Sequence, residues 1–448
     1  MQRTLKKLTI LALVAMLLLS ACGGAATQPP TPEPPPPPGI QEEPPTVQPP
    51  APEPTPELAP EPTEDLTGLS LIFVEETTGV DDGVLRLVQS MEENGQPFYR
   101  TQANPHGLFG SDDIVLLKIN AQWAERGGTN TDLIREVVRA ILGHPEGFTG
   151  EVVIADNGQA QFGSAGTGGS LNWASSNAED PAQSVMSVVG DFQDAGYRVT
   201  GVLWDTFTRM QVGEFSEGDY TDGFVVEDFQ RSTGLEITYP KFTTEFGTRI
   251  SFRYGIWDSE AQSYDSERLR VINMPVLKHH GWFQVTGAVK NYMGTPSDFL
   301  TSGRAHTSTG IGGMGTQMAH TRMPTLNIMD MIWIGTERGP SNPNYRATRT
   351  NLIAASTDAV ALDYWTTRYV LIPAAEQRSG SRTTQMDPAG DYPGTFGHWL
   401  RLSMYEILEA GYHATMNPGY MRVIRRLPNN LPQVYSRPTI LEEYNANG

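Results

Sequence analysis

The sequence contains one cysteine, Cys22, close to its N-terminus. A single thiol cannot form a disulfide within the chain, nor can it supply the set of thiolates that holds structural zinc or an iron–sulfur cluster. We therefore expect the folded part of the chain to have no disulfide, no thiolate metal site, no iron–sulfur cluster and no cysteine nucleophile.

Positive charge is also scarce. Lys and Arg total 32 against 51 Asp and Glu, which leaves a formal net charge of −19 at pH 7. Such a surface repels phosphate backbones and anionic lipid head groups, so we expect no nucleic-acid partner. The Gly-x-Ser-x-Gly elbow of one large class of serine hydrolases is missing as well, which argues against that class.

The N-terminus has the pattern of an export signal. An almost unbroken apolar run at residues 8–19 follows the positive residues Arg3, Lys6 and Lys7. A short apolar core behind positive charge is typical of secretory signals. The run is too short to cross about 30 Å of hydrocarbon as a helix, which disfavours the alternative of an uncleaved membrane anchor.

The residues Leu19-Ser-Ala-Cys22 resemble the lipobox of bacterial lipoproteins. The resemblance implies that the signal peptide, residues 1–21, is removed and that Cys22 is lipidated on sulfur as the first residue of the mature chain. More than one acyl chain gives stable anchoring, because each buried methylene contributes about 0.8 kcal/mol. We expect a protein held on the outer face of a bacterial membrane through this lipid alone.

Residues 22–66 form a Pro/Glu-rich segment. It holds seventeen of the 34 prolines and no Lys or Arg. Such a composition buries too little apolar surface to fold, and its prolines favour an extended polyproline II conformation. We interpret it as a disordered linker or stalk, in preference to a ligand for proline-binding domains.

Residues 67–448 read as one large α/β domain. Short β-branched runs alternate with amphipathic stretches, which indicates βαβ units and a mostly parallel central sheet flanked by helices. Residues 207–266 are aromatic and β-rich, and we expect them to form an insertion. The predicted strands are 69–74, 113–119, 151–155, 198–203, 269–274, 325–331 and 350–355, and the predicted helices are 133–142, 183–195, 359–370 and 398–410.

The densest group of reactive side chains lies between residues 273 and 294. A strand runs into Pro275, and Lys278, His280, Lys290 and Asn291 follow within a short stretch. Polar groups just beyond the C-terminal end of a parallel strand lie where open α/β sheets bind ligands. The alternative is a solvated loop without a function.

Four ordered segments of the sequence resemble the DUF362 family. They are Asp113-Ile-Val-Leu-Leu-Lys-Ile-Asn120, the segment Pro275 to Gly294, the stretch from Asp330 to Pro340, and Ser356-Thr-Asp-Ala-Val-Ala-Leu-Asp363. Together they imply a family core at about residues 112–370. Many relatives carry cysteine-rich ferredoxin segments, which this chain lacks, and Arg338 stands where the family usually has glycine. The family name itself records an unknown function.

The resemblance implies a site, residue by residue. Because Lys278 and Lys290 favour a carboxylate or phosphate, we expect them to converge on one small anionic ligand, unless each extends separately into solvent. Asp358 has a competing interpretation as the cap of the helix that follows it. The implied catalytic residues are Lys278, His280, Lys290, Asp330 and Glu337. The implied ligand-binding residues are Lys118, Asn120, Asn291 and Asp358. If a divalent metal is bound, its candidate ligands are His280, Asp330 and Glu337.

Two classes of function remain open at this point. In the first, the lysines, histidine and carboxylates form an enzyme site that acts on a small anionic metabolite. In the second, the same residues hold a ligand or cation without catalysis. A buried cleft with His280 close to a carboxylate would favour the enzyme. An exposed groove lined by Trp282, Trp333 and Tyr292 would favour a binding protein.

Overall fold

The computed structural model describes residues 68–158, 169–173, 177–230, 232–337, 347–379, 383–425 and 441–443. The described residues belong to one compact unit. The predicted signal peptide, the predicted lipidation site Cys22, the predicted Pro/Glu-rich linker and Arg338 lie outside the described residues. None of the described helices is both long enough and apolar enough to cross a membrane.

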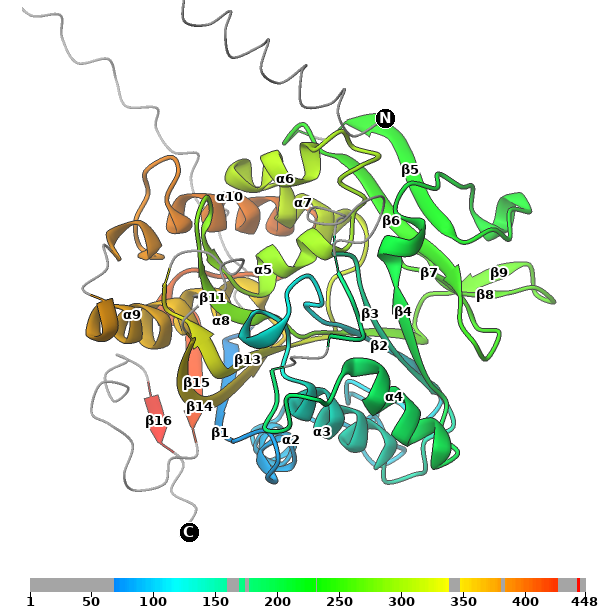
Figure 1. Ribbon diagram of the computed structural model, residues 1–448, viewed down its shortest axis with the longest axis horizontal. Helices are drawn as coiled ribbons and strands as arrows, with labels where there is room; N and C mark the ends of the chain where they lie inside the picture. Colours follow the sequence, from blue (N-terminus) through cyan, green and yellow to red (C-terminus); the bar gives the residue numbers. More distant parts are fainter. Residues whose placement is uncertain are drawn as a thin grey trace, which may run out of the picture. The chain divides into compact units, whose positions relative to one another are not determined.

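A mostly parallel sheet forms the centre of the described unit (Figure 1). Strand β14 is antiparallel to its two neighbours, whereas the other pairs along the main strand order are parallel. The predicted fold class is therefore confirmed. The strands follow the order β16 (Leu441–Glu443), β15 (Met421–Arg425), β1 (Ser70–Glu76), β14 (Ala347–Ser356), β13 (Leu326–Gly335), β10 (Leu269–Asn273), β2 (Ile114–Lys118), β3 (Glu151–Asp156) and β4 (Val199–Leu203).

The sheet is apolar on both faces, because successive side chains of a strand point to opposite sides. In β2, Leu116 joins one hydrophobic cluster, while its neighbours Val115 and Leu117 join the other. A parallel sheet covered on both faces needs such continuous apolar strands. The short β-branched runs in the sequence indicated that these strands are buried on both faces.

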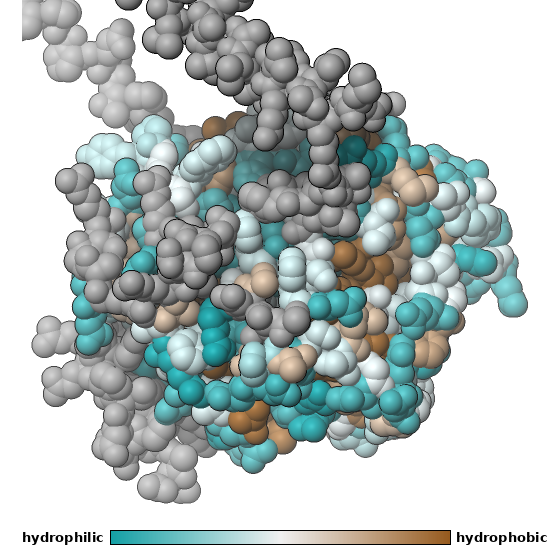
Figure 2. Space-filling model, viewed as in Figure 1, coloured by the Kyte–Doolittle hydropathy of each residue, from teal (hydrophilic) through white to brown (hydrophobic). Residues whose placement is uncertain are grey.

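Three helices cover one face: α2 (Gly83–Glu93), α3 (Thr131–Leu142) and α4 (Val185–Asp194). Asn130 caps α3, since its side chain accepts hydrogen bonds from the backbone N–H groups of Asp132 and Leu133. Hydrophilic side chains predominate over these helices in the lower part of Figure 2, as expected where a helix buries only one side.

The opposite face is covered by α5 (Ala288–Asn291), α6 (Arg304–Ser308), α7 (Gly313–His320), α8 (Ala359–Thr366), α9 (Ile372–Ser379) and α10 (Phe396–Glu409). The β-rich insertion packs into the same cluster. The insertion is β-rich, as predicted, and its strands form a separate antiparallel sheet: β5 (Gly223–Gln230), β6 (Glu236–Thr243), β7 (Arg249–Ser251), β8 (Gly255–Asp258) and β9 (Ser263–Asp265).

The segment after Pro275 is a hairpin, and not the solvated loop of the alternative interpretation. Strand β11 (Val276–His280) pairs in parallel with β13 and in antiparallel fashion with β12 (Gln284–Thr286). The reason lies in β13, which continues beyond the end of β10 as a long hairpin with β14 and offers β11 a new edge. Lys278 therefore lies within a strand, whereas Lys118 ends β2 as expected.

Candidate functional site

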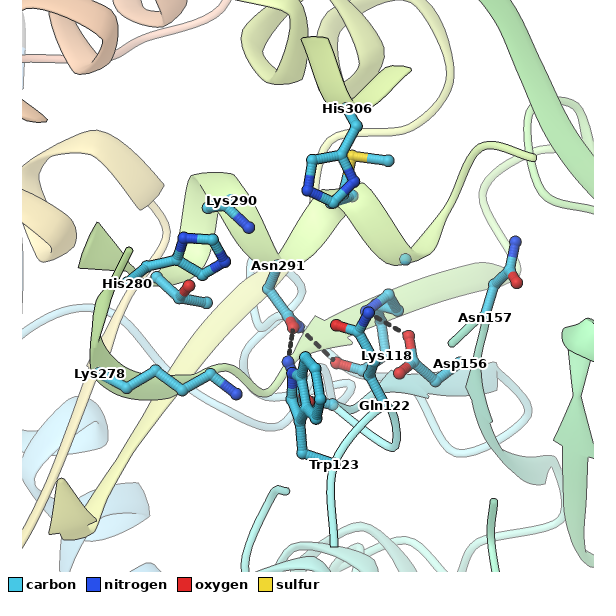
Figure 3. A pocket seen from close by; sticks show the side chains of 14 residues that line it. Lys118, Gln122, Trp123, Asp156, Asn157, Lys278, His280, Lys290, Asn291 and His306 are labelled. Atoms are coloured by element: carbon cyan, nitrogen blue, oxygen red, sulfur yellow. Dashed lines mark hydrogen bonds and ion pairs between the residues drawn. The ribbon is translucent and has the colours of Figure 1, made fainter. Parts of the chain in front are cut away.

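A pocket opens at the edge of the sheet where β2 and β3 end (Figure 3). Its walls come from distant parts of the chain: the ends of two parallel strands, the β11–β12 hairpin, and helices α5 and α6. The lining residues are Lys118, Asn120, Gln122, Trp123, Asp156, Asn157, Lys278, His280, Thr286, Lys290, Asn291, Met293, Gly294 and His306.

A buried ion pair forms one wall. Lys118 and Asp156 are the last residues of the neighbouring strands β2 and β3, and the Lys118 Nζ lies 2.7 Å from Asp156 Oδ1. Burial lowers the pKa of Lys118, and the charge of Asp156 opposes this shift. Asp156 Oδ2 also accepts a hydrogen bond from the backbone of Ala121. Asp156 was not predicted, although its place at a strand end offered the same signal as Lys118.

Gly294 allows the chain after α5 to approach this pair closely. A Cβ atom built on Gly294 would lie 2.2 Å from Asp156 Oδ1 and 2.6 Å from Lys118 Nζ. A side chain of any size would therefore displace the ion pair.

We expect Gly294→Ala to lower the free energy of unfolding by about 1–3 kcal/mol, since overpacking forces buried groups out of position. Denaturant unfolding measures this change. Gly190→Ala is the matched control, because nothing lies within 4 Å of a Cβ at that position in helix α4. The control should be neutral or stabilising. Equal effects of the two substitutions would show that Gly294 is not constrained by the ion pair.

A network of asparagines joins α5 to the central sheet. Asn291 Nδ2 donates to Asn273 Oδ1 at 2.8 Å and to the Lys118 carbonyl at 3.3 Å, and Asn120 Nδ2 donates to Asn291 Oδ1 at 3.4 Å. Within the described part of the chain, Asn120 Oδ1 is buried and has no hydrogen-bond partner. Asn291 thus positions α5, and Asn120 presents an acceptor at the pocket.

A side chain of helix α8 also fixes the position of helix α5 through hydrogen bonds. Both carboxylate oxygens of Asp363 accept hydrogen bonds, at 2.5 Å from the Ala288 N–H and at 3.0 Å from the Val289 N–H. Burial raises the pKa of Asp363 to about 7. These contacts give Asp363 a structural role, because they fix the short helix that carries Lys290.

Two more lysines line the pocket. The Lys278 Nζ donates to the Gly127 carbonyl at 2.6 Å, and the Lys290 Nζ lies 5.4 Å from the centre of the Phe283 ring. Burial, followed by the charge of Lys290, lowers the pKa of Lys278 to about 7. Burial alone lowers the pKa of Lys290 to about 8. Among the described residues, neither amine forms an ion pair within 4.0 Å.

Two histidines complete the upper part of the pocket in Figure 3. Burial lowers the pKa of His280, and the nearby charges of Lys290 and Lys278 lower it further. Burial and Lys290 also lower the pKa of His306 to about 4. Both imidazoles are therefore neutral at pH 7. His306 comes from α6, which gave no local signal in the sequence.

Three predicted site residues do not line the pocket. Asp330 is buried in β13 and accepts hydrogen bonds from the backbone N–H groups of Asn130 and Ile332, while burial raises its pKa to about 7. Glu337 follows the end of β13. Asp358 caps α8, which is the competing interpretation given above.

The predicted metal ligands His280, Asp330 and Glu337 are likewise not brought together. In the ranges that the structure describes, no group of three or more His, Cys, Asp or Glu side chains is arranged to hold a metal ion. Lysine ammonium groups and neutral imidazoles dominate the pocket instead. Such a set of side chains suits an anion better than a cation.

Part of the pocket is lined by a segment that matches a known protein family. Residues 266–368 match the model of a domain of unknown function, DUF362, whereas no curated protein and no solved structure matches the chain. The resemblance read from the sequence is thus confirmed over this segment, although Lys118 and Asp156 precede it. The chain therefore contains a region that matches the DUF362 domain, and this region supplies Lys278, His280, Lys290 and Asn291 to the pocket.

Proposed function

We propose that the pocket binds a small anionic metabolite and that the protein is an enzyme acting on it. The observation that carries this proposal is the burial of Lys278 and Lys290 in one pocket, where only 1% and 6% of their surfaces are exposed. Two ammonium groups in such a place repel each other and lose hydration. An anion between them would offset both costs.

Proton transfer would give this site its catalytic role. A group with a pKa near the working pH exchanges protons most effectively, and the pKa of Lys278 is about 7. The neutral imidazole of His280 lies in the same pocket and can donate or accept a hydrogen bond.

Binding without catalysis remains the second candidate, and one observation favours it. Among the described residues, His280 has no carboxylate partner; its Nδ1 accepts a hydrogen bond from the Trp282 backbone. The three aromatic residues expected to line the groove of a simple receptor are, however, not part of this pocket. Tyr292 is buried and bonded to the Arg322 carbonyl, and neither it nor Trp282 nor Trp333 lines the pocket.

Anion binding can be tested with inorganic phosphate and the full-length protein by isothermal titration calorimetry. We expect Lys278→Met and Lys290→Met each to weaken phosphate binding at least about tenfold, because a charge-assisted hydrogen bond contributes about 1.5–3 kcal/mol. Arg139→Met is the control, since it removes the same charge from an exposed side chain on α3. Unchanged affinity in both lysine variants would contradict the proposal.

We also propose that the protein is lipid-anchored through Cys22 on the outer face of a bacterial membrane. The support is the sequence alone: a short apolar core behind positive charge, followed by Leu19-Ser-Ala-Cys22. The acidic composition argues against adhesion to anionic lipids through the domain surface.

Cys22→Ser should therefore release the protein from the membrane fraction of a bacterial host and abolish incorporation of labelled fatty acid. Both effects should be nearly complete, because the sulfur is the attachment point of the lipid. Ala25→Ser lies just outside the lipobox and should leave both unchanged. Sedimentation of the Cys22→Ser protein with membranes would contradict the anchor.

A further inference from the structure

Lysine is distributed unusually in this chain. The sequence has six lysines and 26 arginines, and only four lysines follow Lys7: Lys118, Lys241, Lys278 and Lys290. All four are buried, and three of them line the pocket. Elsewhere the positive charges of the described unit come from arginine.

The need for positive charge does not by itself explain why the pocket contains lysine and not arginine. Arginine binds carboxylate and phosphate through a planar fork of donors and stays protonated, so it suits anion binding at least as well as lysine. Lysine differs because its amine can lose a proton and then act as a nucleophile. A pocket that concentrates lysine in an arginine-rich protein therefore points to amine chemistry.

The three lysines differ in their surroundings. Lys118 is paired with Asp156 at 2.7 Å, which favours its charged form. Lys290 lies on α5 beside the Phe283 ring, and its charge acts on Lys278. Lys278 alone combines a fixed position, through its bond to the Gly127 carbonyl, with a neighbouring cation and full burial.

These surroundings favour the reactive form of Lys278. Desolvation and a neighbouring cation both stabilise the neutral amine over the ammonium ion, and this is a recognised way to activate a lysine nucleophile. The bond to Gly127 uses one N–H of that amine and leaves its lone pair for a ligand. In Figure 3 the Lys278 side chain extends into the pocket from one side.

We propose that Lys278 forms an imine with the carbonyl carbon of a small oxo compound whose carboxylate or phosphate binds beside Lys290. This inference rests on the proposed anion-binding function and names the class of ligand. The carbonyl group must lie close to the anionic group, because both lysines line the same pocket.

The reaction needs no co-reactant. The lone pair of the Lys278 Nζ forms a C–N bond to the carbonyl carbon, and the π electrons of the C=O bond move to oxygen, which takes up a proton. The nitrogen loses one proton to give a carbinolamine. Its hydroxyl takes up a second proton, the C–O bond breaks and water leaves, and the nitrogen releases its remaining proton to give the imine. His280 and His306, which line the pocket as neutral imidazoles, can relay these protons.

The test is reductive trapping on the full-length protein. The protein is incubated with pyruvate, or separately with dihydroxyacetone phosphate, in the presence of sodium cyanoborohydride, and is then digested with trypsin. Modification of Lys278 blocks cleavage there and yields the fragment 271–290 with the mass of the reduced adduct. We expect at least one of the two compounds to give this fragment, and the pair distinguishes a carboxylate from a phosphate ligand.

Two variants sharpen the result. Lys278→Arg keeps the charge but cannot form an imine, and should give no adduct; Lys290→Arg keeps the neighbouring cation and should still be labelled at Lys278. Mapping of the wild-type protein decides the matter even if a variant fails to fold. Labelling at Lys118, Lys241 or Lys290 instead, or no labelling with either compound, overturns the inference. Phosphate binding measured by calorimetry in the same samples shows whether the anion pocket itself survives that outcome.

Discussion

Replacing Lys118 with methionine is expected to lower the free energy of unfolding by about 3–5 kcal/mol, because it leaves the buried carboxylate of Asp156 without its partner. Lys118 and Asp156 are each almost fully buried, and their charged atoms lie 2.7 Å apart. The change should be visible as a lower midpoint in denaturant unfolding at unchanged slope.

The double variant Lys118→Met with Asp156→Leu separates the two possible causes of this loss. If the unpaired carboxylate is responsible, removing it should restore much of the stability, since a buried ion pair itself contributes little compared with apolar packing. If the double variant is no more stable than Lys118→Met, the loss arises from packing of the lysine side chain and the explanation fails.

Lys278→Met is expected to behave in the opposite way and to exceed the wild-type stability at pH 7. The folded protein holds this amine at a pKa of about 7, against 10.5 for an ordinary lysine. The folded state therefore binds fewer protons than the unfolded state between these values. The contribution of Lys278 to stability is complete above pH 10.5 and is lost as the pH falls towards 7.

We therefore expect Lys278→Met to raise the free energy of unfolding only slightly near pH 10 and by a few kcal/mol at pH 7. The lost hydrogen bond to Gly127 reduces this gain by about 1 kcal/mol. Urea unfolding across pH 7–10 measures the difference. Arg139→Met serves as the control, because an exposed arginine stays charged over this range. If the difference in the free energy of unfolding between the variant and the wild type does not vary with pH, burial does not lower the pKa of Lys278.

The fold could be predicted from the sequence because its main elements carry local signals. The run Ile114–Lys118 is almost wholly apolar, as a central parallel strand must be, and residues 133–142 have the apolar spacing of an amphipathic helix. The strand β11 could not be found in this way. Its pairing depends on the length of β13, which is set by the hairpin that β13 forms with β14 and not by any signal within residues 276–280.

The site was predictable where residues stand at strand ends or in the DUF362-like segment. Lys118, Lys278 and Lys290 were expected to meet, and they line one pocket. His306 was not assigned to this site, because only the packing of α6 brings it there. Asp358 was carried over from the family resemblance, but its side chain caps α8 and bonds to Ser70. Local helix chemistry was the better guide for Asp358.

The position of β1 in the sheet has a consequence for how the chain folds. This strand, near the start of the unit, lies between β14 and β15, where Phe73 pairs with Ala355 and Ile424. Neither partner exists until most of the domain has been synthesised. Because such distant pairings require closure of a very long loop, they slow folding. We expect β1 to join the sheet late and to remain an unpaired, aggregation-prone edge until the last third of the chain arrives.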